Sequence, residues 1–171
     1  MKRDAPHRWE RALAQAQKQL ASSLEAEMAK GDISLSRRGG ELVLDVSDRL
    51  LFPPGAAEVS EQGKKVLFEV AKTLHRLPDR RIQVGGHTDS TRVVSTDLRE
   101  RFPTNWELST ARATNVVRYL QEKGGVSGKR LIAAGFSHFQ PAASNKTERG
   151  RERNRRIELV LLRPDSRAGP D

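Results

Sequence analysis

The chain has 171 residues, of which 36% are hydrophobic, so it is long enough for one domain of ordinary size with an appendage. It contains no cysteine, which excludes disulfides and catalysis by thiolates. Lys and Arg (31) outnumber Asp and Glu (22), and the formal charge of +9 favours an anionic partner such as nucleic acid, acidic lipid or a carboxylate-bearing polymer.

The first thirty residues show a helical pattern rather than an apolar run of signal-peptide or membrane-spanning length. Apolar residues recur there at spacings of three and four: Leu13, Ala16, Leu20, Leu24 and Met28. This spacing predicts a helix from about His7 to Lys30 that ends at Gly31, so residues 1–31 form an N-terminal helix or linker. Its narrow apolar stripe needs a partner, which is the chain's own domain, a second copy in a short coiled coil, or a longer stalk helix joined to an upstream anchor.

Residues 32–163 alternate between strand and helix patterns. The stretch "DISLSRRGGELVLDVSD" has a period of two on both sides of Gly39-Gly40, which predicts a β-hairpin. Further strands are predicted in "RRIQVGGH", "RLIAAGF" and "RRIELVLLR", and further helices from Ser60 to about Leu77 and from Ser109 to about Lys123. This order predicts an α+β fold, a two-layer sandwich of helices on a mixed β-sheet. We expect the tail, residues 164–171, to be disordered.

The helix expected to begin at Ser109 raises a question about Arg112. If Ser109 is the N-cap, Arg112 lies in the first turn, where a cation is mildly unfavourable because of the helix dipole. Asp89 leaves the end of the preceding strand, and consecutive strand and helix ends are usually neighbours. A pocket holding both side chains suits a zwitterion, with Asp89 binding an ammonium and Arg112 binding a carboxylate. The alternative is an internal Asp89–Arg112 salt bridge that only pins the loop.

Four motifs in order resemble the peptidoglycan-binding domain of the OmpA/MotB family: "LFPPGAAEVSEQG", "VGGHTDS", "NWELSTARATNVVRYL" and "NRRIELVL". The resemblance covers about Ile33 to Arg163. The long polar loop that ends in "FPTNWELS" is more similar to the flagellar-stator MotB branch than to the short-loop porin branch. The resemblance implies an OmpA-like fold over residues 32–163, with an extra amphipathic helix before it.

The resemblance also implies a function and a site. Family members bind peptidoglycan without catalysis, through the meso-diaminopimelate residue of the stem peptide, whose free end carries an ammonium and a carboxylate. On this resemblance the acidic contact falls on Asp89 and the basic contact on Arg112. Other positions match less directly: Asn105 and Leu108 in the family's pocket, Thr91 as a weaker match, Arg155 near the site, and Phe52 mainly as a packing residue.

The implied location is periplasmic or elsewhere in the cell envelope, although no signal or transmembrane segment occurs in the given chain. Peptidoglycan is the expected partner, together with a membrane-anchored upstream segment or partner protein and a possible homodimer. An alternative function rests on the stripe of Leu13, Leu20 and Leu24. In that alternative, the chain is a dimerisation or assembly module of an envelope or stator-like complex, with weak binding to the wall.

Other functions are not favoured. His87, Asp89 and Ser90 include the letters of a hydrolase triad, but no nucleophile elbow is present, so we expect no enzyme activity. We expect His87 to bond its own loop's backbone, and Gly85-Gly86 to end a strand that needs unusual backbone angles. The four histidines (7, 75, 87 and 138) lack ligand spacing, so we expect no metal and no cofactor. The basic run "RGRERNRR" is diluted by glutamates and aromatic residues are few, which argues against nucleic acid.

Overall fold

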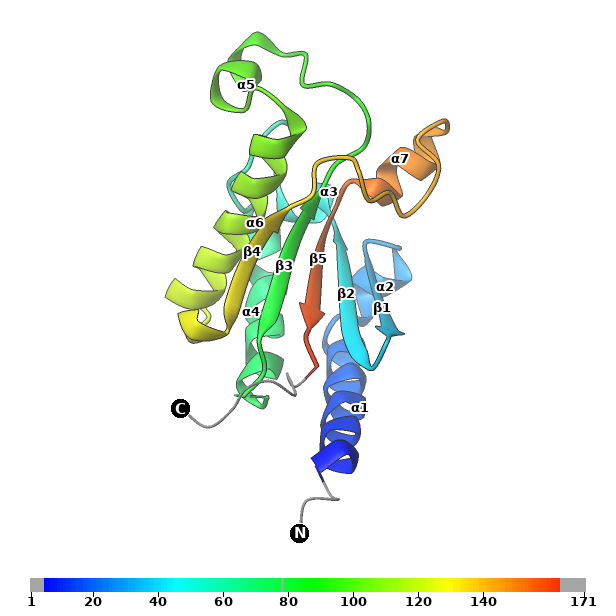
Figure 1. Ribbon diagram of the computed structural model, residues 1–171, viewed down its shortest axis with the longest axis vertical. Coiled ribbons are helices and arrows are strands. Elements are labelled where there is room, and N and C mark those ends of the chain that lie inside the picture. The colour runs from blue at the N-terminus through cyan, green and yellow to red at the C-terminus, as the bar shows by residue number, and fades with distance from the viewer. Residues whose placement is uncertain (1–4, 78, 164–171) are drawn as a thin grey trace.

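A computed structural model describes residues 5–77 and 79–163 (Figure 1). The strands are β1 (Ile33–Arg38), β2 (Glu41–Ser47), β3 (Ile82–His87), β4 (Leu131–Gly135) and β5 (Arg156–Leu161). The helices are α1 (Ala5–Ser23), α2 (Glu25–Ala29), α3 (Asp48–Leu51), α4 (Glu61–His75), α5 (Thr96–Arg101), α6 (Asn105–Glu122) and α7 (Glu148–Asn154), with a 3-10 turn, η1 (Gly128–Arg130). The tail, residues 164–171, lies outside the described residues.

The strands form one mixed sheet in the order β1-β2-β5-β3-β4. The last strand, β5, lies in the centre and is antiparallel to both β2 and β3, whereas β3 and β4 are parallel. Therefore β2 and β3 run in the same direction on either side of β5. The register places Ser47 of β2 and His87 of β3 opposite the same residue, Arg156 of β5. The carboxyl ends of two strands thus flank the beginning of the third.

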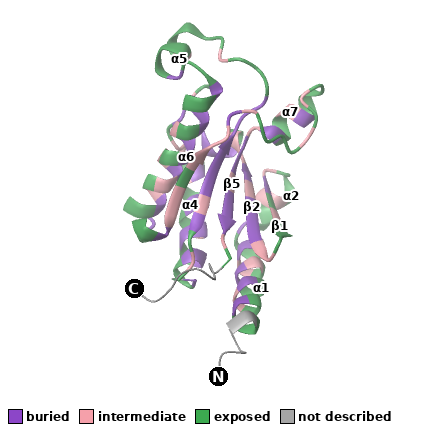
Figure 2. Ribbon diagram, viewed as in Figure 1, coloured by how far each residue is buried: buried purple, intermediate pink, exposed green. Residues whose placement is uncertain are grey.

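Helices α1, α4 and α6 pack on one side of this sheet, which confirms the predicted two-layer sandwich (Figure 1). Figure 2 shows buried residues concentrated in the central strands and on the inner sides of these helices. The predicted hairpin is present, because Leu35 pairs with Leu44 across Gly39 and Gly40, which both have positive φ. The strand residues of the core are paired across β2 and β5: Leu42 with Leu161, Leu44 with Leu159, and Val46 with Ile157.

The N-terminal stripe is buried within the chain's own fold. Leu13, Leu20 and Leu24 are each at most 1% exposed and belong to the same core as the strand residues. Of the three partners considered for this stripe, the chain's own domain therefore holds it. The predicted single helix is divided in two at Leu24, and Gly31, with φ of 78°, ends the segment as expected.

Helix α6 begins at Asn105, four residues before the predicted start. Thr104 is the N-cap, and its hydroxyl accepts a hydrogen bond from the backbone N–H of Trp106 at 3.1 Å. The Glu107 carboxylate accepts one from the backbone N–H of Thr104 at 2.8 Å, which completes a capping box. The sequence "TNWE" contains this signal, and the expectation that Ser109 is the cap was wrong.

Ser109 instead lies inside the helix and is buried. Its hydroxyl donates to the carbonyl of Trp106 and accepts from the backbone N–H of Ser137, both at 3.1 Å. Ser109 thus links α6 to the segment after β4. Since the helix starts earlier, Arg112 lies in the third turn rather than the first, so the helix dipole does not explain its position.

Gly85 and Gly86 continue β3 as far as His87, and neither has a positive φ. The expectation of unusual backbone angles was therefore wrong. Glycine is needed here because neighbouring atoms leave no space for a Cβ atom. A Cβ atom on Gly86 would lie 2.1 Å from the carbonyl oxygen of Ser109. A Cβ on Gly135 of β4 would lie 2.0 Å from the hydroxyl of Thr110. These glycines let the first turns of α6 lie directly on the ends of two strands.

The two long polar stretches each contain a short helix that the sequence analysis did not predict. Helix α5 has no buried residue, so it has no apolar period to detect. In α7 the buried residues are Gly150 and Asn154, which are not apolar markers either. Asn154 holds the preceding loop, because its amide accepts from the backbone N–H groups of Ala142 and Ala143 at 2.7 and 2.8 Å.

His87 lies in β3 and is 5% exposed. Its ring stacks on Phe136 with centroids 4.8 Å apart, and neither ring nitrogen has a hydrogen-bond partner among the described residues. The expectation that His87 bonds its own loop's backbone was wrong, because the strand extends to include it. Burial lowers the pKa of His87 to about 4, and the nearby Arg156 guanidinium acts in the same direction.

Replacing Leu13 with alanine should lower the free energy of unfolding by about 2–5 kcal/mol, because it removes a fully buried side chain from a core shared with the sheet. Urea denaturation followed by circular dichroism measures this change. The control is Gln15→Ala on the exposed face of α1, which should stay within about 0.5 kcal/mol of the parent. Equal, small effects of both substitutions would mean that α1 is not part of the core.

His87 should also make stability depend on pH. The folded protein keeps His87 neutral down to about pH 4, whereas its ordinary pKa is 6.5, so the unfolded chain binds an extra proton between these values. Above pH 6.5 the His87 ring is neutral in both states and the free energy of unfolding does not depend on it. As the pH falls from 6.5 towards 4, the free energy of unfolding decreases, because only the unfolded chain binds the proton. The His87→Phe variant keeps the stacking on Phe136 and removes the titrating group.

The gain in unfolding free energy of this variant over the parent should therefore grow by up to about 3 kcal/mol between pH 7 and pH 4. Asp45, whose pKa burial raises to about 6, shifts stability in the opposite direction, but it is present in both proteins. Urea titrations at pH 7, 5.5 and 4 give the difference. A difference that stays constant with pH would contradict this assignment.

Candidate functional site

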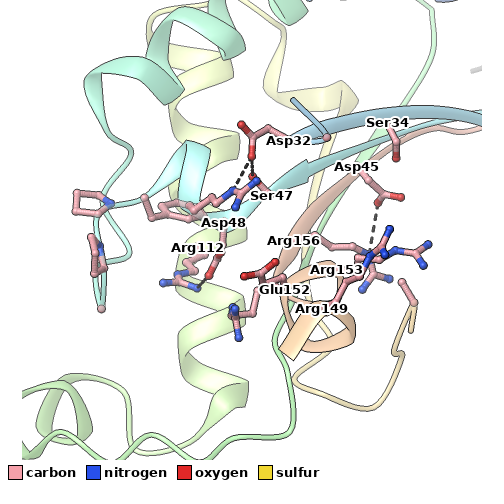
Figure 3. A pocket seen from close by; sticks show the side chains of 18 residues that line it. Asp32, Ser34, Asp45, Ser47, Asp48, Arg112, Arg149, Glu152, Arg153 and Arg156 are labelled. Atoms are coloured by element: carbon pink, nitrogen blue, oxygen red, sulfur yellow. Dashed lines mark hydrogen bonds and ion pairs between the residues drawn. The ribbon is translucent and has the colours of Figure 1, made fainter. Parts of the chain in front are cut away.

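A polar cleft of about 640 Å³ lies at the edge of the sheet where β2 ends and β5 begins. Figure 3 shows Asp32, Ser47 and Asp48 on one side of this cleft. Helix α7, with Arg149 among its residues, forms the other side (Figure 3). The turn Pro53-Pro54-Gly55 closes one end.

Arg112 projects from α6 into this cleft and is mostly buried. Its Nε donates to the carbonyl of Ala56 at 3.0 Å, and its Nη1 donates to Asp48 Oδ2 at 3.2 Å (Figure 3). The guanidinium lies over the ring of Phe52, 4.9 Å from its centroid. Nη2 has no hydrogen-bond acceptor in the described part of the chain. The side chain is therefore fixed on three sides and retains an unused donor.

The Arg112–Asp48 pair is costly to bury. Burial lowers the pKa of Arg112, and the attraction of Asp48 offsets this only in part. Burial likewise raises the pKa of Asp48 against the opposing influence of Arg112 and Arg155. Both shifts show that desolvation exceeds the attraction within the pair. A further anionic group beside Arg112 would replace part of the favourable interaction with water that the guanidinium lost when it was buried.

Asp89 lies just beyond the end of β3 and pairs with Arg155 rather than with Arg112. Its Oδ2 accepts from Arg155 Nη1 at 2.5 Å, and its Oδ1 accepts from the backbone N–H of Thr91 at 2.8 Å. Arg155 also donates to Glu148 at 2.9 Å. Burial lowers the pKa of Arg155, but the hydrogen bonds to these two carboxylates outweigh it and raise the pKa overall.

The four charges form an alternating series: Asp89, Arg155, Asp48 and Arg112. The outer members do not bond each other, so the internal Asp89–Arg112 salt bridge considered as an alternative is absent. Arg112 and Arg155 line the cleft. Asp89 is not part of the lining, but it forms an ion pair with Arg155, which is. A ligand ammonium could reach Asp89 by taking the place of the Arg155 guanidinium.

The remaining expected residues support the Asp89 loop. Asn105, the first residue of α6, donates its side-chain amide to the carbonyl of Thr91 at 3.0 Å. Thr91 contributes its backbone to both Asp89 and Asn105, and its own side chain was not needed for either contact. Leu108 packs with Phe102 in a small separate apolar cluster beneath the same loop. None of Asn105, Thr91 and Leu108 lines the cleft.

Residues that the sequence analysis did not single out complete the site. Asp48 is the first residue after β2, and Asp89 is the second residue after β3. The same signal, a carboxylate just beyond a strand end, would have identified Asp48. Arg149 and Arg153 of α7 also line the cleft. The sequence analysis considered them only as part of the basic run "RGRERNRR", because α7 itself was not predicted.

Within residues 5–77 and 79–163, no three side chains are grouped as ligands for a metal ion. No helix in these ranges combines the length and the apolar content that crossing a lipid bilayer requires. Arginine and carboxylate side chains line the cleft, and such side chains bind groups of opposite charge.

Comparison with known proteins identifies relatives of this chain among curated sequences and among solved structures. The chain is 33% identical to motility protein B of Bacillus subtilis over 71% of this chain and 45% of that protein. It spans about half the length of the curated relatives it matches.

Two solved structures share the fold. A MotB-like protein from Desulfovibrio vulgaris superposes with a TM-score of 0.80 at 29% identity, over 96% of this chain and 99% of that chain. The cell wall anchor of the T6SS from Pseudomonas aeruginosa superposes with a TM-score of 0.74 at 29% identity, over 86% of this chain and 99% of that chain. The model of the OmpA family matches residues 51–155, which is more than half of the sequence and includes the segments that carry Asp89 and Arg112. The chain therefore belongs to the OmpA family.

Proposed function

We propose that this protein binds peptidoglycan without catalysis and anchors an envelope protein or complex to the cell wall. The ligand group is the diaminopimelate side chain of the stem peptide. The observation that carries the proposal is the alternating series of charges, in which Arg112 is buried with one donor unused and Asp89 is reached through a single exchangeable ion pair. The location is the periplasm or another part of the envelope.

The head group of diaminopimelate matches this arrangement charge for charge. Its carboxylate accepts from Arg112 Nη2, beside the existing bond to Asp48. Its ammonium takes the place of Arg155 Nη1 at Asp89, which leaves Arg155 paired with Glu148. Each buried charge then has a partner of opposite charge. This is required because a buried charge without such a partner costs several kcal/mol, about 3–5.

The relatives support this proposal. A similar solved structure, from Pseudomonas aeruginosa, is described as a cell wall anchor. The family resemblance of the "HTD" and "LSTAR" motifs falls on Asp89 and Arg112. The alternative, an assembly module that associates through the N-terminal stripe, has less support because α1 buries that stripe in its own core.

Changing either of the two charged side chains, Asp89 or Arg112, should abolish most binding to purified sacculi. Asp89→Asn keeps the shape of the side chain and removes its charge, and Arg112→Lys keeps the charge and removes the forked donors. Each should weaken binding by about 2–5 kcal/mol, which is roughly thirtyfold or more. Co-sedimentation with sacculi measures the fraction bound, and circular dichroism confirms that each variant is folded.

The matched controls are Asp97→Asn on the exposed helix α5 and Arg118→Lys on the exposed side of α6, where Arg118 pairs with Glu122. Both should pellet as the parent does. If the parent stays in the supernatant, or if the site variants pellet as well as the controls, wall binding through this cleft is wrong.

A second measurement uses the unmodified protein and so does not depend on the folding of variants. Calorimetric titration compares a stem tripeptide that ends in meso-diaminopimelate with the same tripeptide that ends in lysine, which lacks the side-chain carboxylate. The lysine peptide should bind at least about tenfold more weakly, because it leaves Arg112 without its new partner. Equal affinities would exclude diaminopimelate as the group recognised.

A further inference from the structure

The cleft extends well beyond the space that one amino-acid head group needs. Arg112 and Asp48 lie towards one end, beside Phe52, whereas Asp45 and Arg156 lie towards the other (Figure 3). Helix α7 borders the space between these ends. A ligand bound at Arg112 therefore continues along α7 if more of it enters the cleft.

The lining of the cleft carries an excess of positive charge. Six arginines line it against four carboxylates. Most of these charges are already paired: Arg49 with Asp32, Arg112 with Asp48, Arg156 with Asp45, and Arg155 with Asp89 and Glu148. The arginines that remain are Arg149 and Arg153.

The side chains of Arg149 and Arg153 make no hydrogen bond or ion pair within the described ranges of the chain. Both are exposed on α7 and line the cleft together with Glu152 (Figure 3). Glu152 has no ion pair within 4 Å in those ranges either, so it does not neutralise them. Positions four residues apart on a helix lie about 6 Å from each other, so the two guanidiniums can close on a single carboxylate.

We infer that Arg149 and Arg153 form a second subsite, which binds another carboxylate of the same peptide. The inference rests on the proposed function. A stem peptide in which a γ-linked glutamate precedes diaminopimelate has two candidate groups: the free α-carboxylate of that glutamate and the carboxylate at the C-terminus. The free head group of diaminopimelate is separated from its backbone α-carbon by a methylene chain. With the head group at Arg112, the backbone carboxylates of the peptide therefore lie further along the cleft, in the part that α7 borders. Amidation of the carboxylate that binds Arg149 and Arg153 should then lower the affinity of the protein for the peptide.

The experiment is a calorimetric comparison of three synthetic tripeptides, L-alanyl-γ-D-glutamyl-meso-diaminopimelate and its two mono-amides. One amide blocks the α-carboxylate of glutamate, and the other blocks the C-terminal carboxylate. The parent protein should bind one of the amides about three- to tenfold more weakly than the free peptide, as expected for two partly exposed ion pairs.

The double variant Arg149→Gln/Arg153→Gln should bind the free peptide as weakly as the parent binds that amide, and should no longer distinguish the two. The matched control is Arg118→Gln/Lys129→Gln, which removes the same charge from exposed positions outside the cleft lining. The control should keep the full preference of the parent. The amide that loses affinity identifies which carboxylate occupies the subsite.

Two results would overturn this inference, and they differ from failure of the proposed function. If the parent binds all three peptides equally, or if the double variant weakens all three by the same factor, no carboxylate subsite exists at α7. If the parent binds none of the peptides, the proposed function fails, and the second subsite fails with it.

Discussion

The position of β5 between two strands of the same direction is the constraint on which the cleft depends. Because β2 and β3 are both antiparallel to β5, their carboxyl ends lie on either side of its amino end. Asp48 is the first residue after β2, Asp89 is the second residue after β3, and Arg155 directly precedes β5. The register alone therefore places one arginine between two carboxylates. A shift of one residue in either pairing would turn these side chains to the opposite face and disperse the charges.

The fourth charge comes from α6, and its position depends on a close contact between this helix and the sheet as well as on hydrogen bonds. Gly86 and Gly135 remove the Cβ atoms that would otherwise collide with Ser109 and Thr110. Arg112 follows Ser109 by three residues on the same buried side of the helix. The absence of two side chains in the sheet thus determines how deeply the guanidinium enters the cleft. This explains why a glycine, Gly86, comes shortly before the charged loop in the sequence.

Periodic, apolar elements could be predicted from the sequence, and elements without a buried apolar side could not. The hairpin, α4, β5 and the α1 stripe follow from spacing, because in each the residues that pack on the core repeat every two or every three to four positions. Helices α5 and α7 have no such repeat. The start of α6 was misplaced because Ser109 has a good N-cap side chain, whereas the true cap, Thr104, was recognisable only with Glu107 as its partner.

The expected binding pair illustrates the same limit. Asp89 could be selected as a charged residue beyond a strand end, and Arg112 was selected from a helix start that proved to be misplaced and from the family motif. Their partners could not be deduced, because strand order is not encoded in local spacing. Local reasoning considered one pair, Asp89 with Arg112. The sheet order produces two different pairs, since Asp48 comes from a strand more than thirty positions away from Asp89 in the chain.

The N-terminal segment is more than an attachment to this fold. Gly31 and Asp32, where the segment joins β1, line the cleft, and Asp32 binds Arg49 at 2.7 Å and Ser47 at 3.1 Å. These contacts hold the end of β2, from which Asp48 projects towards Arg112. Because α1 is buried in the same core as the strands, a displacement of α1 would be transmitted to the side of the cleft through packed side chains and the Asp32 contacts.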